Sequence, residues 1–97
     1  MRIAQLAQVW GVRCVPHVWG SGIALAAALQ VLAAMPPEPP SLSRRQPLLE
    51  YDRTENSIRE QILATPIEMV DGQVLVPSAH GLGVTVDRDA LERYRVS

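Results

Sequence analysis

The stretch Val15-Pro16-His17-Val18-Trp19-Gly20-Ser21-Gly22 decides the fold, because it joins a short β-type run to a helix that is almost wholly apolar. The predicted helix, residues 23–34, has Gln30 as its only polar side chain. A helix that is apolar all round is expected to be covered by other structure on nearly every side. In α/β folds the residues at strand ends carry the chemistry, so His17, which follows the predicted strand 12–16, is a candidate functional residue.

The remaining elements predict a chain that is part parallel α/β and part antiparallel β. Helical spacing, Asp-Gly turn chemistry and N-cap residues support this interpretation. In chain order we predict an amphipathic helix from Ile3 to Trp10 ended by Gly11, a strand over 12–16, and, after the apolar helix, a proline-rich connection over 36–47 and a second strand over 48–51. A short helix then follows, capped by Asn56 or by Ser57, which has capping-box spacing to Glu60, and stopped by Pro66. The chain ends with a hairpin of 67–70 and 73–76 around Asp71-Gly72 and a last helical turn capped by Asp87.

The composition predicts a single folded domain in a reducing compartment. Hydrophobic residues make up 47% and charged residues 20% of the 97 residues, within the globular range. The net charge is -1 and the basic residues are scattered, so we expect no binding to nucleic acid or to a membrane. The single cysteine, Cys14, is expected to be a buried structural thiol, which favours a cytoplasmic location. As a helix, residues 20–35 would rise only ~24 Å against ~30 Å of bilayer hydrocarbon, which predicts a core helix.

Two ionisable side chains, His17 and Glu50, end the two predicted parallel strands. A histidine beside a carboxylate can form an acid/base pair, although a lone histidine is more often a structural hydrogen-bonding group. An acid at the end of a buried strand costs desolvation free energy unless it is paired or functional, which favours a role for Glu50. We expect His80 to be a solvated loop residue, and Asp52 and Arg53 to pair with each other or to form a turn.

The other motifs do not complete an active site. Gly20 and Gly22 resemble the start of a nucleotide-binding G-x-G-x-x-G loop, but Leu25 stands at the third glycine position, so a turn before a helix is favoured. The sequence has no H-E-x-x-H or C-x-x-C motif, no nucleophile elbow and no carboxylate cluster suited to a hard cation. No metal ligand is therefore assigned.

Five motifs are spread over the chain: Gly11-Val12-Arg13, Val15-Pro16-His17-Val18-Trp19-Gly20, Leu48-Leu49-Glu50-Tyr51-Asp52-Arg53-Thr54, Asp71-Gly72 and Gly81-Leu82-Gly83-Val84. Together they resemble the C-terminal part of the mandelate racemase and muconate-lactonizing group of the enolase superfamily. The resemblance implies an α/β fold, the C-terminal piece of a modified TIM (β/α) barrel. Residues 1–66 would be barrel, with its seventh and eighth strands and their helices, and residues 67–97 would return through a β-hairpin into an α+β capping domain.

The resemblance also implies roles for two residues. The histidine that ends the seventh strand in such enzymes is a general acid/base at the carbon next to a carboxylate, and it corresponds to His17. The acid that ends the eighth strand hydrogen-bonds the developing enolate, and it corresponds to Glu50. The cofactor of the intact family enzyme is Mg²⁺, and the implied substrate is a sugar acid or its lactone.

The metal ligands, a lysine pair and the aspartate that orients the histidine would all precede Met1. The resemblance therefore implies a C-terminal fragment that binds no metal alone and is inactive alone. The reaction stays open among cycloisomerase, dehydratase and racemase, and the intact enzyme is expected to be a homo-oligomer. Two alternatives are an assembly module that completes a separately encoded N-terminal portion and a non-catalytic remnant, and a membrane-associated hydrophobic-helix protein is a weaker one.

Overall fold

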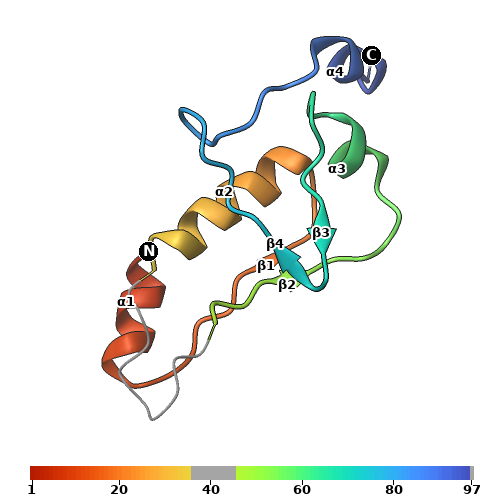
Figure 1. Ribbon diagram of the computed structural model, residues 1–97. Coiled ribbons are helices and arrows are strands. Elements are labelled where there is room, and N and C mark those ends of the chain that lie inside the picture. The colour runs from red at the N-terminus through yellow and green to blue at the C-terminus, as the bar shows by residue number, and fades with distance from the viewer. Residues whose placement is uncertain (36–45, 97) are drawn as a thin grey trace.

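The computed structural model describes residues 1–35 and 46–96, and its longest helix, α2, runs through the middle of the molecule (Figure 1). Residues 36–45 of the predicted proline-rich connection lie outside the described residues. The elements in chain order are α1 (Arg2–Val9), β1 (His17–Val18), α2 (Gly22–Ala33), β2 (Glu50–Tyr51), α3 (Ser57–Gln61), β3 (Met69–Val70), β4 (Gln73–Val74) and α4 (Arg88–Arg93).

Helix α1 forms as predicted and ends at the predicted glycine. Gly11 has a φ of 64°, in the left-handed region that favours glycine. The N–H of Gly11 donates to the Gln8 carbonyl at 3.0 Å, and the N–H of Val12 donates to the Ala7 carbonyl at 2.8 Å. This pair of bonds is the Schellman motif, which satisfies the last carbonyls of a helix and turns the chain toward β1.

Strands β1 and β2 pair in parallel, which confirms the predicted α/β character. His17 lies opposite Glu50, and Val18 lies opposite Tyr51. The N–H of Glu50 donates to the carbonyl of Pro16 at 2.9 Å. Because α2 lies between β1 and β2 in the chain, the three elements form a βαβ crossover.

The predicted positions of the two strands were wrong in part. The strand expected over 12–16 does not form there, because pairing begins at His17, and the strand expected over 48–51 narrows to β2. Pro16 and Pro47 precede the two paired segments, and neither has a backbone N–H to donate to a ladder. The paired positions therefore begin at His17 and Glu50, while the Pro16 carbonyl still accepts from the Glu50 N–H.

Helix α2 forms as predicted, and the Oγ of Ser21 caps it by accepting from the Ala24 N–H at 3.3 Å. The residues that the structure describes supply only part of the cover expected for so apolar a helix, because Ala24 and Val31 are exposed. Short elements, α3 and β1, pack against it and cover one face of its twelve residues. Its buried residues are Gly22, Leu25, Ala26 and Leu29.

Helix α3 begins after Asn56, which decides between the two predicted caps. The Oδ1 of Asn56 accepts from the Arg59 N–H at 3.0 Å. Ser57 is the first helical residue, so the capping box predicted for Ser57 and Glu60 is wrong, since its first member must lie outside the helix.

The hairpin of β3 and β4 confirms the prediction made from Asp71-Gly72. Both turn residues have positive φ angles, 50° and 75°. Val70 pairs with Gln73 directly across the two-residue turn. Positive φ at both central positions is the type I′ geometry that matches the twist of paired strands.

The C-terminal segment returns along α2 and α3. The Nε2 of Gln30, the one polar side chain of α2, donates to the carbonyls of Pro77 at 2.7 Å and Leu82 at 3.3 Å. Val86 then bridges Leu63 in antiparallel fashion. Asp87 caps α4 as predicted, since its Oδ1 accepts from two N–H groups of the first turn.

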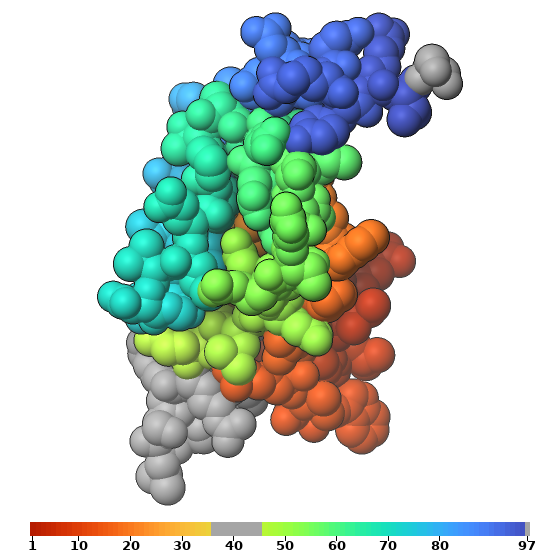
Figure 2. All heavy atoms as spheres, turned by 90° about the vertical axis from the view of Figure 1, so that its right-hand side faces the viewer, coloured from red at the N-terminus to blue at the C-terminus, as the bar shows by residue number. Residues whose placement is uncertain are grey.

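The molecule is elongated, with α1 toward one end and α4 toward the other (Figures 1 and 2). Its principal extents are 50 × 29 × 28 Å and its radius of gyration is 15.3 Å, against about 12.5 Å for a compact domain of this length. Its core is therefore small. The buried apolar residues are Ala4, Leu25, Ala26, Leu29, Ile62, Leu63 and Ala90. No helix in the described ranges is long and apolar enough to cross a membrane.

Candidate functional site

The structure brings together the two side chains that the sequence singles out. The Nδ1 of His17 lies 3.5 Å from the Oε2 of Glu50. The two residues face each other because they occupy the same register position on parallel strands. Side chains at the same position of neighbouring strands project from the same face of a sheet. A pair separated by 33 positions in the chain is thus made by the strand register alone.

Both side chains lie on an open face of the two-stranded sheet. The exposed fraction of the side chain is 56% for His17 and 70% for Glu50. Val18 and Tyr51 alternate with them and are half-buried. Glu50 therefore keeps most of its contact with water in this chain, so burial imposes little desolvation cost on it here.

The His17–Glu50 contact can orient an imidazole but stabilises the fold little. Exposed ion pairs contribute about 0–1 kcal/mol, because water screens the charges and two side chains lose freedom. Since Nδ1 of His17 faces the carboxylate, Nε2 is the nitrogen left to exchange a proton with a third group. The geometry therefore suits an acid/base histidine with a carboxylate partner.

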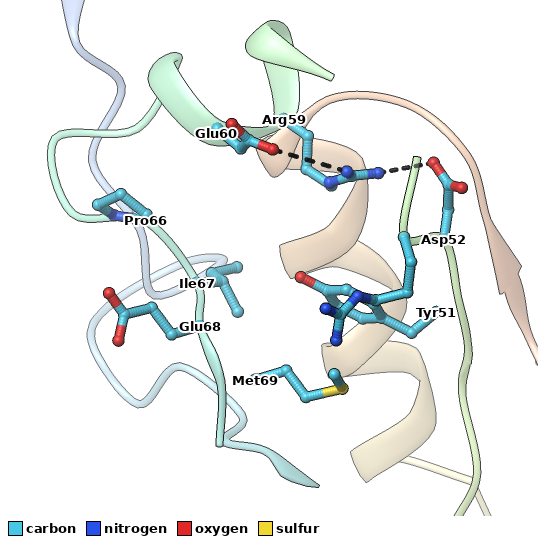
Figure 3. Close-up of a pocket in the computed structure, with 9 residues that line it drawn as sticks. Tyr51, Asp52, Arg59, Glu60, Pro66, Ile67, Glu68 and Met69 are labelled. Carbon is cyan, nitrogen blue, oxygen red and sulfur yellow. Dashed lines mark hydrogen bonds and ion pairs between the residues drawn. The ribbon is translucent and has the colours of Figure 1, made fainter. Parts of the chain in front are cut away.

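Asp52 pairs with Arg59, so the predicted pairing of Asp52 with Arg53 is wrong. The Nη1 of Arg59 lies 2.6 Å from the Oδ2 of Asp52, and the Arg59 side chain is only 9% exposed. The Nη2 of Arg59 donates to the Thr54 carbonyl and lies 3.8 Å from the Oε1 of Glu60. Figure 3 shows the guanidinium of Arg59 held between Asp52 and Glu60.

Asp52 also organises the turn that follows β2, so the alternative prediction of a turn is confirmed. Its Oδ1 accepts from the N–H of Thr54 at 3.0 Å, and the Thr54 hydroxyl lies 2.7 Å from Oδ2. The N–H and hydroxyl of Thr54, followed by the guanidinium of Arg59, lower the pKa of Asp52 below its ordinary value of 3.8. The carboxylate therefore stays ionised and keeps the turn closed.

A single side chain, Asn56, links the loops that follow β1 and β2. Its Nδ2 donates to the carbonyl of Gly20 at 3.1 Å while its Oδ1 caps α3. The sequence predicts only the cap. The available signal was that asparagine, unlike aspartate or serine, carries both an acceptor and two amide donors.

Two pockets lie near the ends of the strands, and neither is lined by His17 or Glu50. A pocket of about 380 Å³ lies on the side of Tyr51 and α3 and is shown in Figure 3. The other, of about 310 Å³, lies between the two loops that follow β1 and β2. Its lining residues are Trp19, Gly20, Ser21, Thr54, Glu55, Asn56 and Ile58.

Of the paired glycines, Gly20 lies in the turn before α2 and Gly22 allows close packing of α2 against α3. Gly20 has a φ of 156°, and Gly22 is buried as the first residue of α2. A Cβ built on Gly22 would lie 2.8 Å from the Arg59 carbonyl oxygen and 2.8 Å from the Leu63 Cδ1. This close approach of α2 and α3 agrees with the turn that the sequence favours over a nucleotide loop.

Other predicted residues lie apart from this site. His80 is exposed in its loop, as predicted. Cys14 is free and only half-buried, so the predicted buried thiol is not fully enclosed by the described residues. Within residues 1–35 and 46–96, no three His, Cys, Asp or Glu side chains gather in a group that could hold a metal ion. The donor set of these residues thus does not fit a magnesium site.

A family model described as "Enolase C-terminal domain-like" matches residues 1–90. The match covers nearly the whole chain, including both strands, α2 and the hairpin. The chain belongs to the enolase C-terminal domain-like family, and its α/β fold is the fold of that family.

Three individual proteins are similar to the chain. The D-galactarolactone cycloisomerase of Agrobacterium fabrum is 48% identical over 95 residues, which are 98% of this chain and 25% of that protein. The arabinonate dehydratase of Saccharolobus solfataricus is 32% identical over 95 residues, 98% of this chain and 23% of that protein. The crystal structure of 3,6-anhydro-D-galactonate cycloisomerase from Zobellia galactanivorans matches with a TM-score of 0.74 and 42% identity, over 96% of this chain and 24% of that one.

The chain thus spans about a quarter of the length of these relatives. The relatives are sugar-acid cycloisomerases and a dehydratase. The similarity to D-galactarolactone cycloisomerase and to a second cycloisomerase confirms the predicted resemblance to the enolase superfamily.

Proposed function

We propose that this chain supplies the acid/base half of an enolase-superfamily active site that acts on a sugar acid or its lactone. His17 is the general acid/base at the carbon next to the carboxylate, and Glu50 is the acid that hydrogen-bonds the enolate. The observation that carries the proposal is the parallel register, which sets these two side chains against each other on an open face. The named activities of the relatives supply the substrate class.

The chemistry explains why these two residue types belong together. A proton next to a carboxylate is weakly acidic, so its removal needs a positioned base and groups that stabilise the charge on the enolate. His17 can take this proton at Nε2 because its Nδ1 faces Glu50. Glu50, when it carries a proton, can donate a hydrogen bond to the enolate oxygen.

Cycloisomerisation and dehydration of sugar acids both begin with this proton transfer. The relatives include both reactions, so the proposal names the shared step and a sugar-acid cycloisomerase as the favoured class. Mg²⁺, which would stabilise the negative charge of the enolate, is proposed to be held by residues outside those described here. By itself the chain is proposed to be inactive.

The architecture of the intact protein follows from the same proposal. We infer a modified (β/α) barrel in which β1 and β2 are the seventh and eighth strands and residues 67–97 belong to a capping domain. The exposed face that carries His17 would then look into the barrel, where the substrate lies. A homo-oligomer in the cytoplasm is the expected state.

One observation favours a second candidate, an assembly module that completes a separately encoded portion of the same fold. Helix α1 exposes 79% of Ile3, 61% of Leu6 and 79% of Val9. Apolar surface of this extent on one short helix marks an interface. Co-expression with the N-terminal three quarters of a relative tests this candidate, because association without a covalent link would restore activity.

The direct test replaces the matching quarter of the Agrobacterium fabrum cycloisomerase with this chain. The fusion is assayed with D-galactarolactone, and His17→Ala is expected to lower kcat by about 10²- to 10⁴-fold, the range for a lost general acid/base. Glu50→Gln is expected to keep more activity than Glu50→Ala, because the glutamine amide still donates a hydrogen bond.

The second histidine provides the matched control. His80 is exposed and lies outside both pockets, so His80→Ala is expected to leave kcat unchanged. Equal losses for the His17 and His80 variants, or full activity without His17, would contradict the proposed role. If the fusion does not fold, co-expression of the two parts provides the same comparison.

A further inference from the structure

We propose that Asn56 is a positioning residue of the site, which ties the loop after β1 to the loop after β2. The inference rests on the proposed function and deepens it. The hydrogen bonds of the Asn56 side chain go to Gly20 and Arg59 and not to His17 or Glu50. Asn56 would therefore act through the backbone that carries those two residues. Its role is separate from the proton transfer itself.

The geometry uses both ends of one amide. The Oδ1 of Asn56 accepts from the Arg59 N–H at 3.0 Å and so caps α3. The Nδ2 of the same amide donates to the Gly20 carbonyl at 3.1 Å, across 36 positions of the chain. Aspartate or serine can cap a helix as well as asparagine, but neither supplies this second amide N–H. The residue type therefore fits the double role.

The Gly20 end of this inter-loop hydrogen bond lies where β1 passes into α2. Gly20 follows His17 by three residues, and the next residue, Ser21, caps α2. A restraint on the Gly20 carbonyl thus fixes the direction in which the chain leaves β1. It limits how far the backbone of His17 can shift relative to β2.

The Asn56 end is held firmly. Arg59 is buried in α3, and its guanidinium bonds Asp52 and the Thr54 carbonyl, so the turn between β2 and α3 is closed. Asn56 lies inside this closed segment, six residues after Glu50. The inter-loop hydrogen bond therefore connects the loop after β1 to the closed turn after β2.

The bond also shapes the 310 Å³ pocket between the loops. Gly20 and Asn56 both line that pocket, one from each of the two loops. Loss of the bond frees one wall from the other. We expect the resulting misplacement of His17 to lower kcat by roughly 10-fold or more, because proton transfer is sensitive to shifts of about 1 Å.

The test compares Asn56→Asp with Asn56→Ala by hydrogen–deuterium exchange and mass spectrometry, on the full chain and on the fusion. Asn56→Asp keeps the cap and loses the inter-loop donor, so exchange is expected to rise in the peptide over 19–25 and to stay unchanged over 57–61. Asn56→Ala loses both bonds and is expected to raise exchange in both peptides. Asn56→Ser keeps a cap without adding charge.

Asp87→Asn provides the control, because it alters a cap on α4 that serves no second purpose among the described contacts. It is expected to leave both peptides unchanged. In the fusion, Asn56→Asp is expected to lower kcat with little change in KM, since Asn56 is proposed to act by positioning His17.

Unchanged exchange over 19–25 in both Asn56→Asp and Asn56→Ser would overturn the inference. So would a change in KM alone, which is the pattern of a binding contact. The exchange readout does not depend on activity, so a failure of His17→Ala to affect the reaction would overturn the proposed function while leaving this inference to be judged by exchange.

Discussion

At the residue scale, Arg59 is the side chain that orders the segment after β2. Arg59 is charged yet buried, and its guanidinium donates hydrogen bonds to Asp52 and to the Thr54 carbonyl. Adjacent residues at a strand end point to opposite faces, which separates Asp52 from Arg53. A residue seven positions away reaches Asp52 because one turn of α3 carries it back over the strand. Sequence adjacency was thus a poor guide to this ion pair.

The lowered pKa of Asp52 predicts a pH-dependent stability. Its pKa is below the ordinary value of 3.8 in the folded chain, so the unfolded chain binds the proton more readily. The stabilisation is present above about pH 4 and is lost as the pH falls through the folded-state pKa. Asp52→Asn is expected to lower Tm at pH 7 and to flatten the dependence of Tm on pH below 4, measured by circular dichroism.

Asp71→Asn is the matched control for that prediction, because Asp71 lies exposed in the hairpin turn and asparagine also tolerates its positive φ. Its Tm should follow the pH dependence of the unmodified chain. A wild-type pH dependence in Asp52→Asn would contradict the assigned role of the carboxylate.

At the element scale, the close approach of α2 and α3 depends on the absence of one side chain. Gly22 begins α2 and is buried against the Arg59 carbonyl and Leu63. Leu63 and Ile62 then continue the buried face at the end of α3. Ile58, on the same helix, is 41% exposed.

Gly22→Ala is therefore expected to destabilise the fold by about 1–3 kcal/mol, the usual cost of overpacking. The added Cβ would lie 2.8 Å from a backbone oxygen, which cannot move as a flexible side chain can. The measurement is chemical denaturation of the full chain at low concentration. A midpoint equal to that of the unmodified chain would contradict the packing described.

Gly11→Ala separates packing from backbone strain. Gly11 has a positive φ but no atom within 4 Å of an added Cβ, so its cost should be the left-handed backbone term of about 1–2 kcal/mol. Because Gly22 has no positive φ, the two variants report two different causes.

At the scale of the whole molecule, a small core and a long shape leave much apolar surface in water. The exposed apolar residues of α1 extend along the helix to Trp10, which is 76% exposed. The helix is amphipathic as predicted, but among the described residues nothing covers its apolar side. An amphipathic pattern predicts that one face of a helix packs against other structure, but it does not specify which structure.

We therefore expect the isolated chain to associate with itself as its concentration rises. Replacing apolar residues of α1 by the double variant Ile3→Lys, Leu6→Glu should shift the weight-average mass toward the monomer in sedimentation equilibrium. Gln5→Glu, on the same helix, should not. A monomer at all concentrations in the unmodified chain would contradict this expectation.

Local features of the fold were predictable because they depend on a few neighbouring residues. Asp71-Gly72 specifies its turn through backbone conformations that few residues adopt, and Gly11 ends α1 for the same reason. Asp87 caps α4 through bonds to residues two and three positions ahead. Strand bounds were less predictable, because a strand exists only where a second segment, distant in the sequence, supplies donors and acceptors in register.

The candidate site likewise has features that are local in the sequence and features that depend on distant residues. The sequence by itself singled out His17 and Glu50 on the two parallel strands, since residue type is a local property, although each is the first residue of its strand and not the last. Only the tertiary structure decided that they face each other at 3.5 Å and that Asn56 joins the loops behind them. The physical reason is that strand register and loop-to-loop hydrogen bonds join residues more than thirty positions apart, which no local pattern of residues specifies.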